Sequence, residues 1–494
     1  MDYMNIFPVI SLLYICIHIL VSNLSKNTKK SPKLPPGPPS YPLIGNILQL
    51  APPKLPETLS KLSKIYGPIM TVKIGTITTV VISSPNIAKE ALHKNDQTLA
   101  NRLIPEAVQA LSHDKASLIF MPLSPKWKIF RKFCATKIFS SQQLDSTQSI
   151  RLKKMKELLD YLQENCKKGE AIDIGQLAFT TVLNSISNTL FSIDLASYSS
   201  GSSQIFRNVI SRMLVEASKP NIADYYPILR RFDPMGARRR MKKYYETILT
   251  VFDTIVEERI QKGNCTEGSD VLDSFLKLTQ EENLELTRHD LLHIFLDLFV
   301  AGIDTTSATI EWAMAELLNN PEKLMKTRKE LQQVLNKDEY PKDSDITKLP
   351  YLQAVVKESL RLHPTAPILV HKSVAEVDMC GFKVPKDAQV LINVWNMGRD
   401  SSIWTDPNSF IPERFLESET EIRGEDFGYI PFGTGRRMCP GIPLAQRVVH
   451  TMLASFLYQF DWKLPQKSQV MDMSEKYGIT LHKVKPLIAI PFRE

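Results

Sequence analysis

The chain contains the stretch Phe432-Gly433-Thr434-Gly435-Arg436-Arg437-Met438-Cys439-Pro440-Gly441, and the rest of its 494 residues are organised around it. The spacing is F-x-x-G-x-R-x-C-x-G. Gly435 permits a tight turn with positive φ, and such a turn directs backbone N–H groups at the cysteine sulfur. Pro440 and Gly441 are placed to open a helix, because proline is tolerated in the first helical turn. The pattern predicts a cysteine that is held in a fixed loop as a metal ligand.

A cysteine in this setting can ligate haem iron as a thiolate, which pushes electron density onto the iron and favours O–O cleavage. Arg437 can pair with a haem propionate, since a planar guanidinium suits a carboxylate. Phe432 can shield the sulfur from water. The alternative is a loop with one incidental cysteine, because most buried cysteines are inert core residues. Five matching positions in ten residues argue against that alternative.

These residues closely resemble the haem-binding loop of the cytochromes P-450, the haem-thiolate monooxygenases. The resemblance implies a fold that is mainly α with a small β region. It implies haem b with the Cys439 thiolate as axial ligand, and Phe432, Arg437 and Gly441 around the macrocycle. It also implies O2 as co-substrate and electrons that come from NADPH through NADPH–cytochrome P-450 reductase.

The composition is that of a globular protein, with 43% hydrophobic and 23% charged residues. No internal repeat or low-complexity linker divides the chain after the N-terminal region, so residues 54–494 are expected to form one catalytic domain. The net charge of +8 is modest, and no basic block is interleaved with aromatics, which argues against nucleic acid as a partner. Six scattered cysteines indicate a reducing compartment and no disulfide framework.

The N-terminal residues 1–22 are predicted to be a membrane anchor. Residues 6–21 are almost wholly apolar and would span roughly 24 Å as a helix. A cleaved signal peptide is the alternative, but no basic residue precedes the run and no A-x-A site follows it. Lysines follow the apolar run at positions 26, 29, 30 and 33, so the N-terminus is expected in the lumen and the rest of the chain in the cytoplasm.

Residues 23–53 are expected to be a polar and proline-rich hinge. Residues 32–39 contain five prolines and favour polyproline II, a semi-rigid spacer. A ligand for SH3-type domains is the alternative interpretation. The order of an anchor followed by P-P-G-P resembles endoplasmic-reticulum members of the P-450 family, especially those of plants. The expected location is therefore the endoplasmic-reticulum membrane, with a single span.

The body of the chain has one clear strand signal. Residues 69–72 and 77–82 are rich in β-branched side chains and flank Gly75-Thr76, which predicts a hairpin. Most of the remaining sequence mixes apolar and charged residues with helical period. The sequence therefore predicts a mainly helical domain with a small sheet.

Trp127 and Arg131 are spaced i, i+4 and would share one helix face. In the P-450 family, W-x-x-x-R contributes a propionate contact from both residues. A surface arginine near a core tryptophan is the alternative. The same segment is basic, which suits either a solvated helix face or the docking of an acidic electron donor, through Lys126, Lys128, Lys132 and Lys137.

Residues 219–243 combine apolar side chains with a dense set of arginines and lysines. Apolar and cationic residues together suit a membrane surface. In the family this region is a helix–loop–helix lid over the substrate. A solvated basic helix is the alternative.

Residues 291–316 form a long helical run that carries Ala301-Gly302-Ile303-Asp304-Thr305-Thr306. Gly, Asp and Thr are poor choices inside a helix, and such local conflicts often mark function. A small residue lets a flat cofactor approach, and a threonine hydroxyl can leave the backbone ladder to bond oxygen. The run matches the A-G-x-D-T-T helix of the family, which implies that Asp304 and Thr305 deliver protons. A packing glycine beside an incidental Asp-Thr is the alternative.

Two further motifs are expected to be structural or to contact the cofactor. Glu358 and Arg361 form E-x-x-R, and by resemblance they build a buried triad with Arg414 of P-E-R-F. His363 is expected to be a packed structural histidine. His371 occupies the place where relatives carry Pro followed by Arg or His, and by resemblance it contacts a propionate. This chain lacks that proline, by a one-residue deletion.

The chain is similar in detail to the plant group that includes geraniol hydroxylases, abietane-diterpene oxidases and the tyrosine hydroxylases of betalain synthesis, through residues 219–227, 298–302 and 475–480. The resemblance implies a mostly apolar pocket wall made of Phe120, Val300, Ala301, Ala366, Ile368, Leu369, Ile479 and Thr480. Such a wall suits a small hydrophobic terpenoid, a monoterpene alcohol or a diterpene. A phenolic substrate such as tyrosine is the alternative, although an amino acid would need a charged partner.

Two other classes of function remain alternatives. One is a haem-thiolate isomerase or dehydratase that uses no O2, but relatives of that kind tend to lose the acid–threonine pair, which is intact here. The other is a non-enzymatic haem-binding or membrane scaffold protein, which would bind haem without NADPH-dependent turnover.

Overall fold

The computed structural model describes residues 33–50, 54–262, 270–279, 286–336, 340–418, 420–465 and 471–493. The predicted anchor at residues 1–22 lies outside these ranges, as does the first part of the predicted hinge. The described part of the hinge lies on the domain: Thr71 N–H donates to the Pro36 carbonyl at 2.8 Å. A side chain at Gly37 would collide with the Thr71 backbone. The proline-rich segment therefore contacts the sheet and is not a free spacer.

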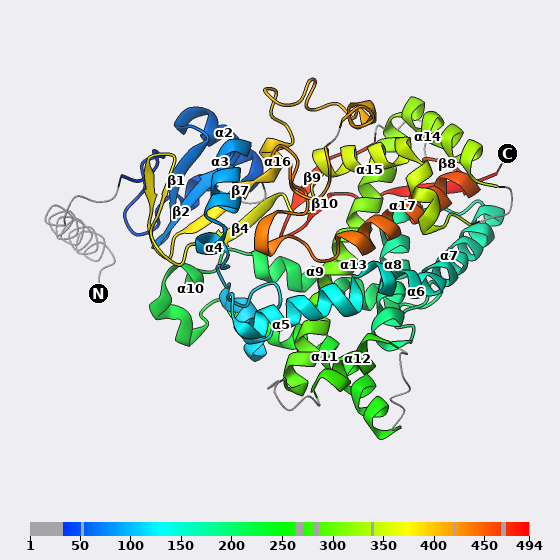
Figure 1. Cartoon of the computed structure of the whole chain (residues 1–494), viewed down its shortest axis with the longest axis horizontal. Helices are drawn as coiled ribbons and strands as arrows, with labels where there is room; N and C mark the ends of the chain where they lie inside the picture. The colour runs from blue at the N-terminus through cyan, green and yellow to red at the C-terminus, as the bar shows by residue number, and fades with distance from the viewer. Residues whose placement is uncertain are drawn as a thin grey trace, which may run out of the picture.

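The largest sheet has four strands in the order β1-β2-β7-β4 and lies at one end of the molecule (Figure 1). Strands β1 and β2 pair antiparallel with Thr71 opposite Val80, and Gly75 turns between them at φ +59. The predicted hairpin is confirmed. Strand β2 pairs parallel with β7, which pairs antiparallel with β4. The bounds are β1 (Ile69–Ile74), β2 (Ile77–Ile82), β7 (Gln389–Asn393) and β4 (Ile368–Lys372).

Three smaller sheets lie among the helices and loops. Strand β11 pairs antiparallel with β3 and with β8, β9 pairs with β10, and β5 pairs with β6. The bounds are β3 (Ile172–Asp173), β11 (Ile488–Phe492), β8 (Asp461–Lys463), β9 (Glu475–Tyr477), β10 (Leu481–Lys483), β5 (Val377–Met379) and β6 (Phe382–Val384).

Helices make up most of the rest of the described chain, as the helical periodicity predicted. Their bounds are α2 (Leu55–Tyr66), α3 (Pro85–Lys89), α4 (Asp96–Leu99), α5 (Pro125–Phe133), α6 (Ser141–Ser146), α7 (Gln148–Lys168), α8 (Ile174–Phe191), α9 (Ser202–Ser218), α10 (Ile222–Tyr225), α11 (Ala237–Gln261), α12 (Val271–Thr279), α13 (Arg288–Asn319), α14 (Pro321–Val334), α15 (Pro350–Leu362), α16 (Val394–Met397) and α17 (Ile442–Gln459).

Helix α13 runs through the middle of the helical part and packs against α8, α11, α15 and α17 (Figure 1). A capping box starts it: Thr287 Oγ1 accepts the Asp290 N–H, and Asp290 accepts the Thr287 N–H at 3.0 Å. Asn320 follows the last residue and Pro321 begins the next helix. Within the described residues, α13 alone is long and apolar enough to cross a membrane, but 72% of that window is buried, so it is a core helix.

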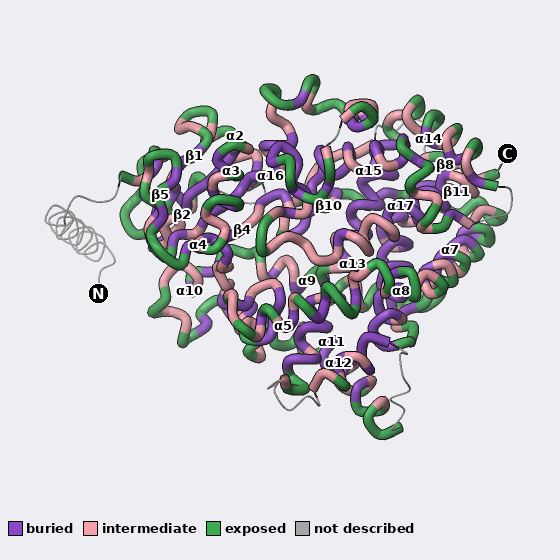
Figure 2. The backbone as a smooth tube through the Cα atoms, in the orientation of Figure 1, coloured by how far each residue is buried: buried purple, intermediate pink, exposed green. Residues whose placement is uncertain are grey.

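The core follows this arrangement. Figure 2 shows the buried residues concentrated along the central helices and the sheet, with exposed residues at the outer turns. The main apolar cluster joins α7, α8, α11, α13, α15 and α17, and a second cluster lies around the four-stranded sheet. The site described next lies where α13 meets the Cys439 loop.

Candidate functional site

A cavity of about 350 Å³ lies between α8, α13, the start of α17 and the Cys439 loop. That volume falls in the range of small-molecule sites. The side chains that line it are mainly apolar and come from helices and loops far apart in the sequence; they include Leu118, Ile119, Val182, Ile186, Leu190, Leu298, Ala301, Ala366, Leu369, Phe432 and Leu444. Cys439 is on the same lining.

The Cys439 loop is held by two glycines with left-handed backbones, Gly433 at φ +71 and Gly435 at φ +68. A Cβ at Gly435 would lie 2.8 Å from the Leu92 carbonyl oxygen, so only glycine fits. Cys439 N–H donates to the Phe432 carbonyl at 3.0 Å and closes the loop. The predicted tight turn at Gly435 is present.

The start of the following helix differs from the prediction. Helix α17 begins at Ile442, with Gly441 as its N-cap residue. The proline in its first turn is Pro443. The prediction that Pro440 occupies the first turn was wrong, because Pro440 precedes the N-cap residue. Pro440 and Gly441 both line the cavity beside the cysteine. Gly441 lies so close that a Cβ would be 3.8 Å from Cys439 Sγ.

The Cys439 thiol is half-buried and on the cavity wall. Burial raises its pKa above the ordinary value, while the N–H groups of Gly441 and Ile442 and the charge of Arg131 lower it in part. A nearby metal cation would favour the thiolate, because a coordinating thiol is deprotonated outright. The sulfur is therefore placed and hydrogen-bonded as a ligand for a metal in the cavity.

Four arginines line the same cavity. Arg151 pairs with Asp343 at 2.5 Å, and the other three are Arg102, Arg131 and Arg437. Within the described residues, their hydrogen-bond partners are backbone carbonyls: Arg437 donates to Ala100 and Met121, each at 2.6 Å, Arg131 to Met438 at 2.6 Å, and Arg102 to Val370. The Arg102 Nε is buried without a partner. Burial lowers the pKa of Arg437 to about 9 and of Arg102 to about 10, and the other two arginines lower that of Arg437 further.

Such a cluster of buried cations suits an anionic ligand. Each guanidinium can bind a carboxylate through two parallel hydrogen bonds. No ion pair with a carboxylate is found for the three arginines within the residues described. The cluster and the Cys439 sulfur therefore fit a haem, which combines a metal ion with two propionates. Arg102 was missed by the sequence analysis, where the only signal was a lone arginine among apolar residues after α4.

Trp127 and Arg131 lie one turn apart on α5, and both line the cavity as their spacing predicted. The helix is capped by Ser124, which accepts the Trp127 backbone N–H at 3.1 Å. The Trp127 indole N–H donates to the Leu118 carbonyl at 3.0 Å, and the Arg437 guanidinium lies 4.7 Å from its ring centroid. The indole thus holds Arg437 in place, and its own N–H is already used.

His371 lies on β4 and lines the cavity, but it does not offer a proton to it. Its Nδ1 lies 2.8 Å from the Leu99 carbonyl oxygen and donates to it. Burial lowers the pKa of His371 to about 3, so the ring is neutral and its other nitrogen carries no proton. Donation to a propionate would require a proton on this second nitrogen, which a neighbouring carboxylate would favour. The propionate contact at His371 therefore stays a prediction, and Arg102 supplies a further cation on the same lining.

Helix α13 presents Ala301, Gly302 and Thr305 to the cavity. A Cβ at Gly302 would lie 2.7 Å from Ile186 Cδ1, so the glycine permits close packing of α8. The Thr305 hydroxyl donates to the Ala301 carbonyl at 2.7 Å, and the helix is continuous through this turn. The Thr305 hydroxyl is therefore bonded to the helix backbone, whereas the sequence analysis expected it to be free to bond oxygen.

Asp304 is buried and is not on the cavity lining, because one residue step turns it about 100° around the helix from Thr305. Its Oδ2 accepts the Thr480 hydroxyl at 2.6 Å and His482 Nε2 at 3.0 Å. Burial alone would raise the pKa of Asp304, but the charge and hydrogen bond of His482 and the Thr480 hydroxyl hold it below the ordinary value. The structure thus separates Asp304 from Thr305, although the two are neighbours in the chain.

The predicted pocket wall is only partly on the cavity. Ala301, Ala366 and Leu369 line it. Thr480 lies instead beneath Asp304, because its hydroxyl is bonded there. Four predicted wall residues are outside the lining: Phe120, Val300, Ile368 and Ile479. The chain neighbours of the first three line the cavity instead, namely Ile119, Ala301 and Leu369.

One acidic residue on the lining was not foreseen. Asp297 lies on α13, two turns before Thr305. Its carboxylate accepts the Ser117 hydroxyl at 2.7 Å and the Ile119 N–H at 3.2 Å, and lies 3.1 Å from His113 Nε2. These bonds tie the loop after the 3₁₀ segment Glu106–Lys115 to α13 and use most of the carboxylate's capacity.

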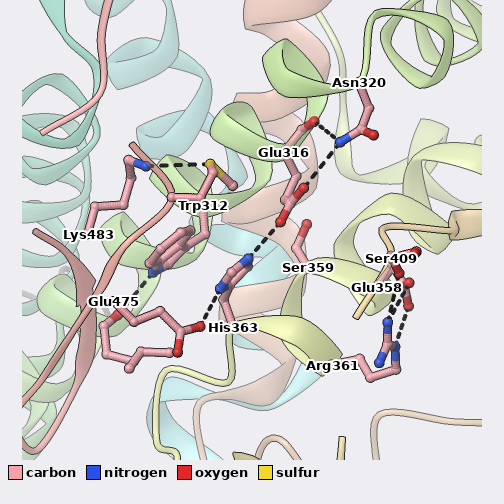
Figure 3. Close-up of polar contacts among 12 residues, drawn as sticks. Trp312, Glu316, Asn320, Glu358, Ser359, Arg361, His363, Ser409, Glu475 and Lys483 are labelled. Carbon is pink, nitrogen blue, oxygen red and sulfur yellow. Dashed lines mark hydrogen bonds and ion pairs between the residues drawn. The ribbon is translucent and has the colours of Figure 1, made fainter. Parts of the chain in front are cut away.

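The predicted brace residues meet in the interior. Arg361 donates to both oxygens of Glu358, at 2.7 and 2.8 Å, and Arg414 Nε donates to Glu358 at 3.1 Å. Arg361 also donates to the Ser409 carbonyl (Figure 3). It donates to the Pro407 carbonyl as well. Neither Glu358 nor Arg361 lines the cavity. This geometry suits a structural role and not an acid in the reaction.

A second buried network surrounds His363 (Figure 3). Its two ring nitrogens lie 2.7 Å from Glu316 and 2.8 Å from Glu475, and the ring stacks on Trp312 with centroids 3.8 Å apart. Glu475 also pairs with Arg399 at 3.0 Å. The network joins α13, the end of α15 and β9, which agrees with a packed structural histidine.

The two basic segments are partly neutralised. In the first, Lys126 pairs with Asp290 at 2.5 Å, while three lysines stay exposed: Lys128, Lys132 and Lys137. In residues 219–243, the chain forms α10, a 3₁₀ segment at Pro227–Phe232 and the start of α11. Several of its arginines are paired with acids, among them Arg240 with Glu216 at 2.6 Å and Arg238 with Glu106.

A comparison with protein-family models matches residues 35–490 to the description Cytochrome P450. That range includes the Cys439 loop, α13, the brace and the arginine cluster.

Curated relatives cover the whole chain. Geraniol 8-hydroxylase from Catharanthus roseus is 46% identical, over 99% of each chain. Cytochrome P450 monooxygenase 76AD131 from Lophophora williamsii is also 46% identical over 99% of each chain. 7-ethoxycoumarin O-deethylase from Helianthus tuberosus is 44% identical over the same share of each.

Proposed function

The chain belongs to the cytochrome P450 family, and we propose that within it this enzyme hydroxylates a small apolar terpenoid, a monoterpene alcohol or a diterpene. The predicted resemblance to plant P-450s is confirmed. The protein is a haem-thiolate monooxygenase that uses O2 and takes electrons from NADPH through a redox partner. Relatives named as a monooxygenase and a hydroxylase favour this activity over the isomerase and haem-scaffold alternatives.

The apolar lining of the cavity carries the substrate proposal. On α8 and α13 the wall combines aliphatic side chains such as Val182, Ile186 and Leu298 with uncharged serine and threonine hydroxyls. The one acid there, Asp297, already accepts hydrogen bonds from the protein. A charged amino acid would leave its ammonium and carboxylate largely unpaired, at a cost of several kcal/mol or more. An olefin or alcohol carries no charge, so the free-energy cost of removing it from water into such a site is small.

The names of relatives support the same choice. Two geraniol 8-hydroxylases, from Catharanthus roseus and Swertia mussotii, are each 46% identical to the chain. The O-deethylase of Helianthus tuberosus acts on an aromatic ether, as its name states. The substrates in these names, geraniol and 7-ethoxycoumarin, are both small and uncharged.

The roles proposed for individual residues follow from their positions. Cys439 would hold the haem iron, and Arg102, Arg131 and Arg437 would hold its propionates. When bound, the haem supplies O2 activation and the oxidising chemistry. Gly302 lets α8 pack closely against α13 beside the cavity, and Thr305 presents a hydroxyl to the same cavity. The apolar wall orients the substrate and excludes bulk water.

Membrane attachment through residues 1–22, with the domain on the cytoplasmic side of the endoplasmic reticulum, is part of the proposal. An exposed apolar surface supports it: Ile228 is 84% and Phe232 72% exposed. Tyr226 donates to the Leu43 carbonyl at 2.8 Å, so this surface adjoins the N-terminal segment, whose Leu48 is also exposed. Exposed apolar and cationic side chains together suit a bilayer surface.

The reductase is proposed to dock near the exposed lysines of α5 and the segment after it. Lys128 and Lys132 are exposed on α5, which lines the cavity, and Lys137 is exposed in the segment after it. Opposite charges steer a protein encounter.

Product analysis by mass spectrometry tests the substrate. Membranes that carry the enzyme and a plant reductase are given NADPH, O2 and, separately, geraniol, an abietane olefin and tyrosine. We expect a product one oxygen heavier from a terpenoid and none from tyrosine, because only the neutral compounds match the apolar wall. The product should be absent without NADPH.

Leu298→Asp is the matched variant for this test. It places a second charge on the apolar wall without touching the Cys439 loop, so terpenoid product should fall while haem binding persists. Oxidation of tyrosine alone would contradict the terpenoid assignment and favour a phenolic substrate. No product from any compound, with intact thiolate-ligated haem, would also contradict it.

A further inference from the structure

Asp304 and Thr305 are the family's acid–alcohol pair, yet the structure keeps them apart. Thr305 lines the cavity and donates to Ala301, whereas Asp304 is turned to the hairpin of β9 and β10. Asp304, Thr480 and His482 form a closed triangle, since His482 Nε2 also lies 2.9 Å from Thr480 Oγ1. For Asp304 to serve the cavity, this triangle must open.

His482 connects the triangle to solvent. It lies on β10, and 33% of its side chain is exposed, whereas Asp304 is buried. The strand is fixed against α13, because Trp312 donates its indole N–H to the Leu481 carbonyl at 3.2 Å. The ring is thus a bridge between water and a carboxylate that water does not reach directly.

The charges around His482 favour its protonated form. Burial lowers its pKa, but Asp304 and, more weakly, Glu311 on α13 raise it, and Arg207 on α9 opposes them; the net direction is upward. Glu311 itself accepts the Leu487 N–H at 2.8 Å, and Arg207 pairs with Asp173 at 3.2 Å. Because the pKa of Asp304 is lowered at the same time, the proton rests on His482.

We propose that His482 loads Asp304 with a proton and, by the same step, frees it to turn toward the cavity. This role rests on the proposed site, in which Thr305 faces the reacting oxygen. His482 acts through Asp304 and is therefore a positioning residue. The hydroxyl of Thr480 guides the carboxylate but carries no charge of its own.

The step is balanced as a single proton transfer. The Nε2–H bond of the imidazolium breaks, an O–H bond forms on Asp304 Oδ2, and both partners become neutral. The charge attraction that holds Asp304 on β10 disappears with the transfer, and a buried neutral acid is far less costly to move than a buried carboxylate. The partly exposed ring then regains a proton from solvent. The same proton transfer therefore protonates Asp304 and breaks its ion pair with His482.

The competing explanation is that His482 only holds Asp304 in place by a hydrogen bond. That structural role needs a hydrogen-bond donor at position 482 but no titrating proton. His482→Gln keeps an amide donor and removes the proton, so it separates the two explanations. Lys476→Gln is the control, because Lys476 is exposed on β9 directly opposite His482 and loses a charge without touching Asp304.

The first measurement is the hydrogen peroxide released per NADPH oxidised by full-length enzyme with reductase, which needs no organic substrate. A lack of protons at the cavity diverts electrons to peroxide. We expect His482→Gln to lower the share of NADPH electrons that does not end in peroxide by roughly tenfold. Loss of a residue that gives its proton directly to the reacting group would lower it by about a hundredfold or more. In the wild type the peroxide fraction should rise as pH rises through the raised pKa of His482, and this rise should be absent in His482→Gln.

The second measurement does not depend on turnover. The raised pKa of His482 adds stability that is present below its ordinary value of 6.5 and is lost as pH rises through the folded pKa. The lowered pKa of Asp304 adds stability above its ordinary value of 3.8. The Tm difference between wild type and His482→Gln should therefore be larger at pH 6 than at pH 9.

The outcomes separate this inference from the proposed function. An unchanged peroxide fraction and pH profile in His482→Gln would overturn the proton role, even with a lowered Tm. An equal Tm difference at both pH values would mean that no charged pair exists, which also overturns it. If the enzyme oxidises no terpenoid but His482→Gln gives the expected peroxide and Tm results, the substrate proposal is wrong and the role of His482 is supported.

Discussion

Cys439→Ala is expected to remove thiolate-bound haem and to reduce NADPH-dependent product to the level of membranes without the enzyme. The reason is geometric: within the described residues, Cys439 is the cysteine on the cavity lining that Arg102, Arg131 and Arg437 share. The backbone N–H groups of Gly441 and Ile442 are directed at its sulfur. The measurements are haem content, the reduced carbon monoxide spectrum and product yield.

Two other cysteines serve as controls. Cys134 is fully buried after α5, and burial raises its pKa to about 12, so it is a poor ligand. Cys380 is exposed in the turn between β5 and β6. Replacing either with alanine should leave the carbon monoxide spectrum unchanged. A normal spectrum in Cys439→Ala, or its loss in both controls, would contradict the assignment of the axial ligand.

Arg361→Ala is expected to lower the free energy of unfolding by about 3–5 kcal/mol, because it leaves the Glu358 carboxylate buried without its main partner. The side chains of Glu358 and Arg361 have no exposed surface, and Arg361 makes two short bonds to Glu358. Arg414 and the Ile411 backbone N–H remain on Glu358. Unfolding by denaturant, followed by circular dichroism, measures the change.

Lys326→Ala is the matched control for this measurement. Lys326 also pairs with the P-E-R-F segment, through Glu413 at 2.6 Å, but it is exposed, and exposed pairs contribute little. Arg361→Lys tests geometry separately from charge, since lysine cannot make two parallel bonds to one carboxylate. A loss in Arg361→Ala no larger than that of Lys326→Ala would show that the brace is no stronger than a surface pair.

Local signals in the sequence predicted the parts of the fold that depend on neighbouring residues. β-branched runs around a glycine predicted the hairpin of β1 and β2. The periodic apolar run predicted α13, and the F-x-x-G-x-R-x-C-x-G spacing predicted the loop that holds Cys439. The E-x-x-R and P-E-R-F motifs predicted that Glu358, Arg361 and Arg414 meet. Each depends on short-range chemistry or on a strong family motif.

Side-chain direction was harder to predict, because one residue step turns a helix by about 100° and a strand by half a turn. Ala301 lines the cavity and Val300 does not; Leu369 lines it and Ile368 does not. The same step separates Asp304 from Thr305. A pattern of residue types places such positions near a site but does not fix which one faces it.

Long-range partners were not predictable from the pattern either. Asp304 is fixed by Thr480 and His482, which lie more than 170 residues later in the chain. The backbone bond of His371 to Leu99 decides which ring nitrogen carries the proton. Arg102 has no motif around it and became a candidate only when the structure placed it beside Arg437. These features depend on the assembled fold.

X-ray absorption at the iron edge of the purified enzyme tests the central claim most directly, because it detects the atoms bound to the metal. We expect one sulfur ligand in the wild type and in Cys134→Ala, and none in Cys439→Ala. A wild-type iron site without sulfur, or a sulfur ligand that persists when Cys439 is replaced, would contradict the assignment of this loop as the haem-thiolate site.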